Sequence, residues 1–108
     1  MSQFRNNPEE ANAPQASGST STSAVTTVGA ATSVLFWGGS SAVMADEGYY
    51  LIIQNQGTVN LEIRFGAATT GIVLPALSTF EVALSQGAEV YVANTGGVAG
   101  YAVAVLFA

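Results

Sequence analysis

From residue 24 onward the chain alternates short runs of β-branched and aromatic residues with turns rich in Gly, Asn and Ser. The clearest run is 59–65, in which every second residue is apolar and the residues between them are Asn, Glu and Arg. This two-residue periodicity is typical of a half-buried strand. No segment has the periodicity of a helix, so we predict an all-β fold.

The pattern predicts seven to nine short strands. The candidate strands are 24–28, 31–37, 42–44, 49–54, 59–65, 72–74, 79–84, 89–93 and 100–108. Run 49–54 is apolar on both faces, as in a central strand. Pro75 indicates that 72–74 is either an edge strand or a connection that ends there. A strand count near eight favours a small antiparallel β-sandwich of the jelly-roll type.

The composition changes near residue 24. Residues 1–24 contain two prolines and a Ser/Thr-rich run, and they have too little apolar bulk to offset the entropy of ordering. We therefore divide the chain into an extended N-terminal arm, 1–24, and a β-sandwich domain, 25–108. The arm is either a flexible tail or an anchor that orders on a partner, with Phe4 and Arg5 as its contact residues.

The residues that most catalysis requires are scarce. Residues 25–108 contain one basic side chain, Arg64, and the whole chain lacks Lys, His and Cys. Acid–base and nucleophilic catalysis, metal binding and phosphate binding depend largely on these residue types or on clustered carboxylates. We expect no enzyme activity, no cofactor, no metal and, at a net charge of −5, no nucleic-acid partner.

Nor does the sequence suggest a membrane protein. No run of about 18 apolar residues is present, so no transmembrane helix is expected. Residues 1–10 lack the basic-then-apolar layout of a signal peptide, which predicts synthesis in a cytoplasm.

The charge density is low: 8% of residues are charged, against roughly 25% in typical soluble domains. Such a domain either covers itself with small polar residues or buries part of its exterior against other subunits. The last run, 100–108, is apolar on both faces. One face carries Tyr101, Val103, Val105 and Phe107. The run is either a central strand covered on both sides or a strand whose Tyr101–Phe107 face is an oligomer interface.

Two charged groupings have ordinary explanations. Glu62 and Arg64 lie two apart on one strand face and are expected to form a solvated ion pair. Glu81 and Glu89 are expected on neighbouring strands, within reach of Arg64. Run 46–48 offers two carboxylates, far fewer than the six to eight oxygens that calcium takes, and is expected to be an exposed turn.

An aromatic grouping leaves two alternatives open. Trp37, Tyr49 and Tyr50 could form a ligand platform for a sugar. Alternatively, Trp37 closes the core of the sandwich. The glycines that follow Trp37 lack the Lys and helix of a phosphate-binding loop.

Several turn-and-strand motifs follow one another between residues 49 and 95. They are Ile53-Gln-Asn-Gln-Gly57, Val59-Asn-Leu-Glu-Ile-Arg-Phe-Gly66, Leu74-Pro-Ala-Leu-Ser-Thr-Phe80 and Ala88-Glu-Val-Tyr-Val-Ala-Asn94. This layout resembles the small β-sandwich virion proteins of tailed bacteriophages, which serve as capsid decoration (cement) proteins, head fibres or small tail-surface proteins. The shared motifs are structural, and the resemblance implies no catalytic residues.

The resemblance implies a non-enzymatic virion structural protein, foremost a capsid decoration or cement subunit. Its implied partners are the major capsid protein or other virion proteins, and it would form homo-oligomers, of which a trimer is one candidate. The second hypothesis is a receptor- or carbohydrate-binding module of a phage fibre or spike.

Overall fold

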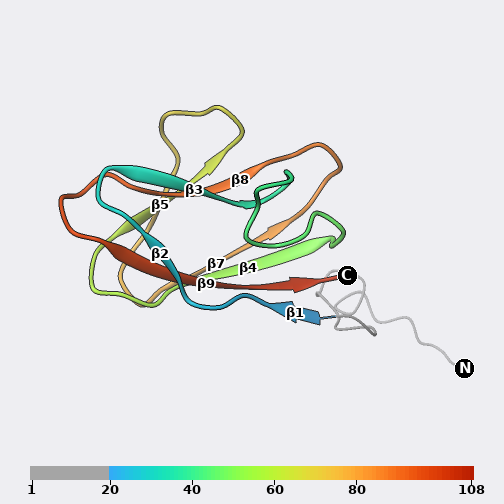
Figure 1. The fold of residues 1–108 in the computed structure, drawn as a ribbon, viewed down its shortest axis with the longest axis horizontal. Coiled ribbons are helices and arrows are strands. Elements are labelled where there is room, and N and C mark those ends of the chain that lie inside the picture. Colours follow the sequence, from blue (N-terminus) through green and yellow to red (C-terminus); the bar gives the residue numbers. More distant parts are fainter. Residues whose placement is uncertain (1–19) are drawn as a thin grey trace, which may run out of the picture.

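A computed structural model describes residues 20–108, which form nine strands and no helix (Figure 1). The strands are β1 (Thr20–Thr22), β2 (Thr26–Val28), β3 (Thr32–Trp37), β4 (Tyr50–Asn55), β5 (Leu61–Phe65), β6 (Ile72–Leu74), β7 (Thr79–Ala83), β8 (Val90–Asn94) and β9 (Gly100–Phe107). The all-β prediction is confirmed. The alternation predicted from the sequence is also observed, with Val90 and Val92 of β8 pointing into the core.

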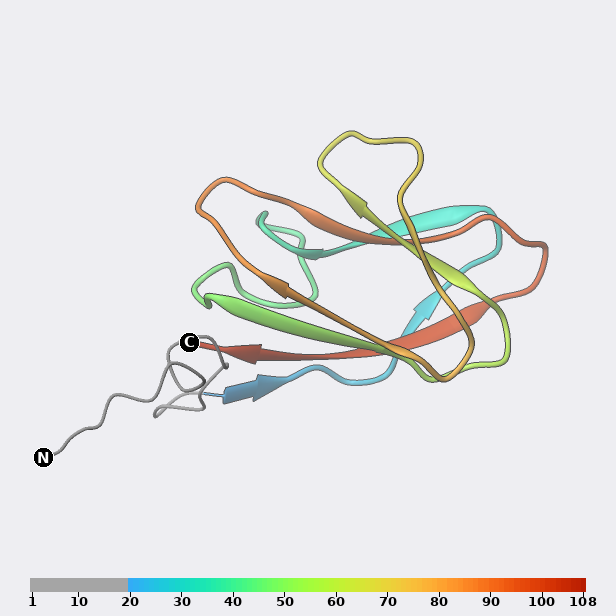
Figure 2. The ribbon, with the colours of Figure 1, turned by 180° about the vertical axis from the view of Figure 1, so that it is seen from behind.

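The strands pair in a nested order. β2 pairs with β9, β3 with β8, β4 with β7 and β5 with β6, all antiparallel. These pairs alternate between two sheets, one ordered β1-β9-β4-β7 with β2 also on β9, the other β3-β8-β5-β6. Eight strands nested in this way form a jelly roll, and the two sheets are stacked as separate layers (Figures 1 and 2).

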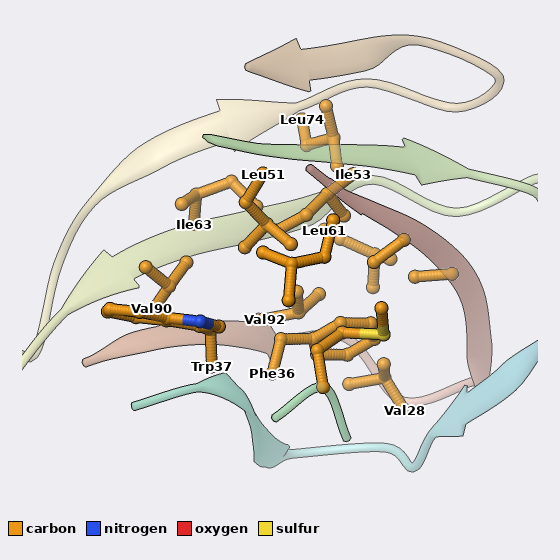
Figure 3. Close-up of a cluster of buried hydrophobic side chains, with 14 residues drawn as sticks. Val28, Phe36, Trp37, Leu51, Ile53, Leu61, Ile63, Leu74, Val90 and Val92 are labelled. Atoms are coloured by element: carbon orange, nitrogen blue, oxygen red, sulfur yellow. The ribbon is translucent and has the colours of Figure 1, made fainter. Parts of the chain in front are cut away.

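The core lies between these two layers. Figure 3 shows side chains from β3, β4, β5 and β8 meeting there. Phe36, Leu51, Ile53 and Ile63 are fully buried. Because alternate residues of each strand point inward, the core is continuous along the sandwich.

One strand lies within the predicted arm. Thr20–Thr22 form β1, which pairs with the end of β9, Thr20 opposite Phe107. Beyond β1, Ser23 and Ala104 exchange two hydrogen bonds: the Ser23 N–H donates to the Ala104 carbonyl, and the Ala104 N–H donates to Ser23 Oγ. β1 buries no side chain, so hydrophobic patterning gives no sign of it. The remainder of the predicted arm, with Phe4 and Arg5, lies outside the described residues.

The predicted strand at 42–44 is wrong. This segment makes one isolated bridge, between Trp37 and Met44, and the N–H groups of Val43 and Met44 donate to carbonyls of β3. Gly38 opens this connection with a φ of 112°. A Cβ there would lie 2.1 Å from the Ala88 carbonyl oxygen, so the reversal requires glycine.

Two loops at one end of the sandwich each begin at a buried asparagine. Asn55 and Asn94 each end a strand and begin the pattern Asn-x-Gly-x-Val. In both, the side-chain oxygen accepts the N–H two residues on, and the amide donates to the carbonyl four residues on. Each amide also donates to a distant strand, Asn55 to Leu74 and Asn94 to Val28. The two side chains therefore fix their own turns and join them to other strands.

Candidate functional site

The outer face of the β1-β9-β4-β7 sheet is mainly apolar. On β9, Ala102, Ala104 and Leu106 are buried in the core, so Tyr101, Val103, Val105 and Phe107 point away from it. No strand or helix within residues 20–108 packs over them, since the sheet is an outside layer (Figure 1). On this face Tyr101 is exposed, and Val103, Val105 and Phe107 are half-buried. Within the described residues, therefore, the strand is not covered completely on both faces.

Strand β4 widens this apolar surface. Ile52 lies opposite Val105, and Tyr50 lies opposite Phe107. The rings of Tyr50 and Phe107 lie 6.3 Å apart, tilted by 56°. We call the six outward apolar and aromatic residues of these two strands the outer band; the third outward residue of β4, Gln54, is polar and lies opposite Val103. The outer band consists of Tyr50, Ile52, Tyr101, Val103, Val105 and Phe107. The sequence pattern predicted the β9 half of this band. For Ile52, the signal in the sequence was that run 49–54 is apolar on both faces.

Small polar residues border the outer band. Thr22 and Thr27 pair with Val105 and Tyr101 on one side, and Thr79 pairs with Gln54 on the other. Across the described strands of this sheet, the single charged residue is Glu81.

Glu81 is held by a tyrosine of the outer band. The Tyr50 hydroxyl donates a 2.8 Å hydrogen bond to Glu81 Oε1. This hydrogen bond is the main reason that the pKa of Tyr50 lies above 10.0, with desolvation and the carboxylate charge adding to it. The face therefore carries one carboxylate, already engaged, beside an uncharged apolar strip.

The outer face of the second sheet is more polar. Arg64 Nε donates to Glu62 Oε1 at 2.6 Å, which confirms the predicted ion pair. Tyr91 donates to Glu89 at 3.2 Å, and burial is the largest cause of its raised pKa, followed by that hydrogen bond. The expected adjacency of Glu81 and Glu89 is wrong, because β7 and β8 belong to different sheets.

A shallow, open depression of about 390 Å³ lies on this second sheet. Its lining consists of Ala31, Thr32, Ser33, Arg64, Asn94 and Thr95. The guanidinium of Arg64 is already paired with Glu62, and the rest of the lining is neutral. This depression has no acid–base or nucleophilic arrangement.

The three residues of the predicted ligand platform do not form one surface. Trp37 is 3% exposed and lies in the core (Figure 3). Tyr49 is 41% exposed just before β4, and Tyr50 belongs to the outer band. Since the indole is buried, it offers no face on which a sugar could stack.

The described residues also contain no arrangement for metal chemistry. Within 20–108, no three Asp, Glu, His or Cys side chains gather where they could hold an ion. Asp46 and Glu47 are exposed in a turn, as expected. Over the same range, no helix has the length and apolarity needed to cross a membrane.

The outer band thus lies on an outside face of the sandwich. Comparison with known proteins adds no relative: the chain matches no family model, no curated protein and no solved structure.

Proposed function

We propose that this protein is a non-enzymatic structural protein of a virion, acting as a capsid decoration or cement subunit. The observation that carries the proposal is the outer band, an apolar sheet face that the described chain leaves uncovered. An uncovered apolar sheet favours association with another protein surface. The jelly-roll fold, which recurs in viral capsid proteins, and the sequence resemblance over residues 49–95 support the virion setting.

The physical basis of such a role is repetition. A capsid presents the same site many times, so an oligomer that makes several modest contacts is held far more tightly than one subunit. Contacts of this kind need little charge, in agreement with the composition of 8% charged residues. The partners would be the major capsid protein or other virion proteins, and the protein would be made in the host cytoplasm and carried on the particle.

The N-terminal arm has a separate place in this proposal. Phe4 and Arg5 are proposed as its contact residues on the capsid, and the β9 half of the outer band as an interface between subunits. Truncation of residues 1–19 is expected to weaken attachment and leave the sandwich folded, because every described strand lies after that point. Unchanged attachment would contradict the role of the arm.

Quantitative mass spectrometry of purified particles tests the proposed function. A decoration subunit is expected at a fixed, high ratio to the major capsid protein. Mild denaturant is expected to strip it without opening the shell, whereas salt is not, because contacts with little charge are not weakened by screening. Absence from washed particles would contradict the proposal. So would saturable glycan binding by the free protein, which would favour the carbohydrate-binding hypothesis, since lectins also use jelly rolls.

A further inference from the structure

We propose that two copies of this chain pack face to face through the outer band. The inference rests on the proposed function, because both assign this sheet face to assembly, and it names the first partner as a second copy. The outward faces of β9 and β4, the area and charge of the sheet, and the symmetry of a two-fold pair all bear on this dimer.

The outward faces of β9 and β4 are the surfaces through which these two strands can contact another molecule. β9 is paired with β1 and β2 on one side and with β4 on the other, and β4 is paired with β9 and β7. Their main-chain groups are therefore used within the sheet, and another chain cannot add to them as a further strand. Contact with the outer band must be made by packing side chains against it.

The area of this face suits a small, weak interface. The strands of the sheet differ in length: β9 has eight residues, β4 has six, β7 has five, and β1 and β2 have three each. At about 3.3 Å along the strand and about 4.8 Å between strands for each residue, the sheet covers roughly 400 Å² in projection. Two facing sheets would bury about 800 Å², more once the side chains are included, which is the size of a weak, transient contact. This predicts a weak, reversible dimer.

The charge of the face suits a copy of itself. The outer band is uncharged. Glu81 lies opposite Ile52 on the neighbouring strand β7, and its carboxylate accepts a hydrogen bond from Tyr50. Glu62 and Arg64 lie on β5 of the other sheet. A strongly charged partner would find little complement here, whereas a second copy offers the same largely apolar face.

Symmetry makes the middle of the outer band decisive. In a two-fold pair, each residue meets the same surface on its partner, so residues near the axis lie close to their own counterparts. Ile52 and Val105 lie opposite each other on β4 and β9, with outer-band residues on either side. We place the axis at Val105, because Glu81 lies beside Ile52 on β7 and its two copies would repel each other if the axis passed there. One substitution at Val105 then changes both sides of the centre at once.

Sedimentation equilibrium of the full chain tests the inference with Val105→Lys. The control is Val73→Lys: Val73 is 57% exposed and lies on β6 of the other sheet. The wild type is expected to approach twice its 11.0 kDa mass as its concentration rises from about 1 μM to about 1 mM, the range of weak interfaces. Val105→Lys should raise the dimer dissociation constant at least ~10-fold, and Val73→Lys by less than ~2-fold. A monomeric wild type at ~1 mM, or equal effects of the two lysines, would overturn the inference.

A mixing experiment separates the interface from misfolding. Val105→Lys and Val105→Glu are each expected to be monomeric, while an equimolar mixture should form a mixed dimer, because opposite charges then meet at the axis. Only folded subunits can restore the pair. A mixture that stays monomeric would contradict the two-fold arrangement.

The fates of the two proposals can be told apart. A monomer in solution that is nevertheless abundant on particles would overturn the face-to-face pair and leave the proposed function standing. A dimer that is absent from particles would overturn the proposed function and leave the face-to-face pair standing.

Discussion

The buried side chain of Asn94 gives the sharpest test of how the sandwich is held together. Asn94 is 1% exposed. Its amide donates to the carbonyls of Val28 at 3.1 Å and Val98 at 2.7 Å, and its oxygen accepts the Gly96 N–H at 2.9 Å. These three bonds join the end of β8 to the end of β2, which lies in the other sheet, and fix the turn into β9. Asn94→Ala would remove all three.

The expected loss follows from this count. Each hydrogen bond contributes about 1 kcal/mol net, and a buried group left without a partner costs about 1–3 kcal/mol. We therefore expect Asn94→Ala to lower the free energy of unfolding by about 3 kcal/mol. With a urea m-value of about 1.5 kcal/mol/M, the midpoint would fall by about 2 M.

The fluorescence of Trp37, the single tryptophan of the chain, reports unfolding directly because the indole is buried. The matched control is Asn60→Ala: Asn60 is exposed and accepts one bond, from the Ala76 N–H at 3.2 Å. That change should cost less than about 1 kcal/mol. Equal midpoints for the two variants would mean that the buried hydrogen bonds of Asn94 stabilise the fold no more than the exposed bond of Asn60.

A second substitution separates hydrogen bonding from shape. Asn94→Asp keeps the shape and the acceptor oxygen but loses both donors. The new carboxyl would be buried beside two carbonyl oxygens, which raises its pKa above the unfolded value of about 3.9. Its penalty relative to wild type should therefore be smallest below that pH and grow as the pH rises through the raised pKa. A penalty independent of pH would contradict the burial of this group.

Two further predictions concern the packing of Gly71 and the charge beside the outer band. At Gly71 a Cβ would lie 1.8 Å from the Ile63 carbonyl oxygen, so Gly71→Ala should lower the free energy of unfolding in urea by about 2 kcal/mol or more. Gly97→Ala is the control and should be nearly neutral, because a Cβ there would have nothing within 4 Å. Similar urea midpoints for the two variants would show that the 66–71 loop adjusts freely. Glu81→Gln should bring the pKa of Tyr50 down toward 10.0, because the hydrogen bond to the carboxylate is the largest cause of its increase; the contribution of this bond to stability is present at neutral pH and is lost as the pH rises through the raised pKa. An ultraviolet titration of tyrosinate checks this, and an unchanged curve would mean that the bond does not persist in solution.

Much of the fold follows from local pattern. Two-residue periodicity located most of the strands, and of the two alternatives that Pro75 left open, the edge strand is observed, as β6. β5 begins two residues later than predicted, at Leu61, because the carbonyl of Val59 accepts a bond from the Asn55 side chain. The nested pairing of strands could not be derived, since it depends on contacts between the two ends of the chain.

The candidate site shows a different limit. The pattern of β9 predicts two apolar faces, but a sequence does not say whether the second face is covered by the same chain or by another molecule. Trp37 illustrates the same point, because it is buried against residues distant in the sequence, such as Val90, its partner on β8. β1 was not predicted because its main chain pairs with β9 while none of its side chains is buried.

Chemical crosslinking at Val105 shows whether the outer band is an interface between copies of the chain. The chain has no cysteine, so Val105→Cys and Val73→Cys each introduce a single thiol. Facing sheets lie about 10 Å apart, too far for a disulfide but within reach of a bis-maleimide of similar length. We expect a crosslinked dimer that forms at least ~10-fold faster at position 105 than at the more exposed position 73. Equal rates at the two positions would mean that the outer band is not the interface.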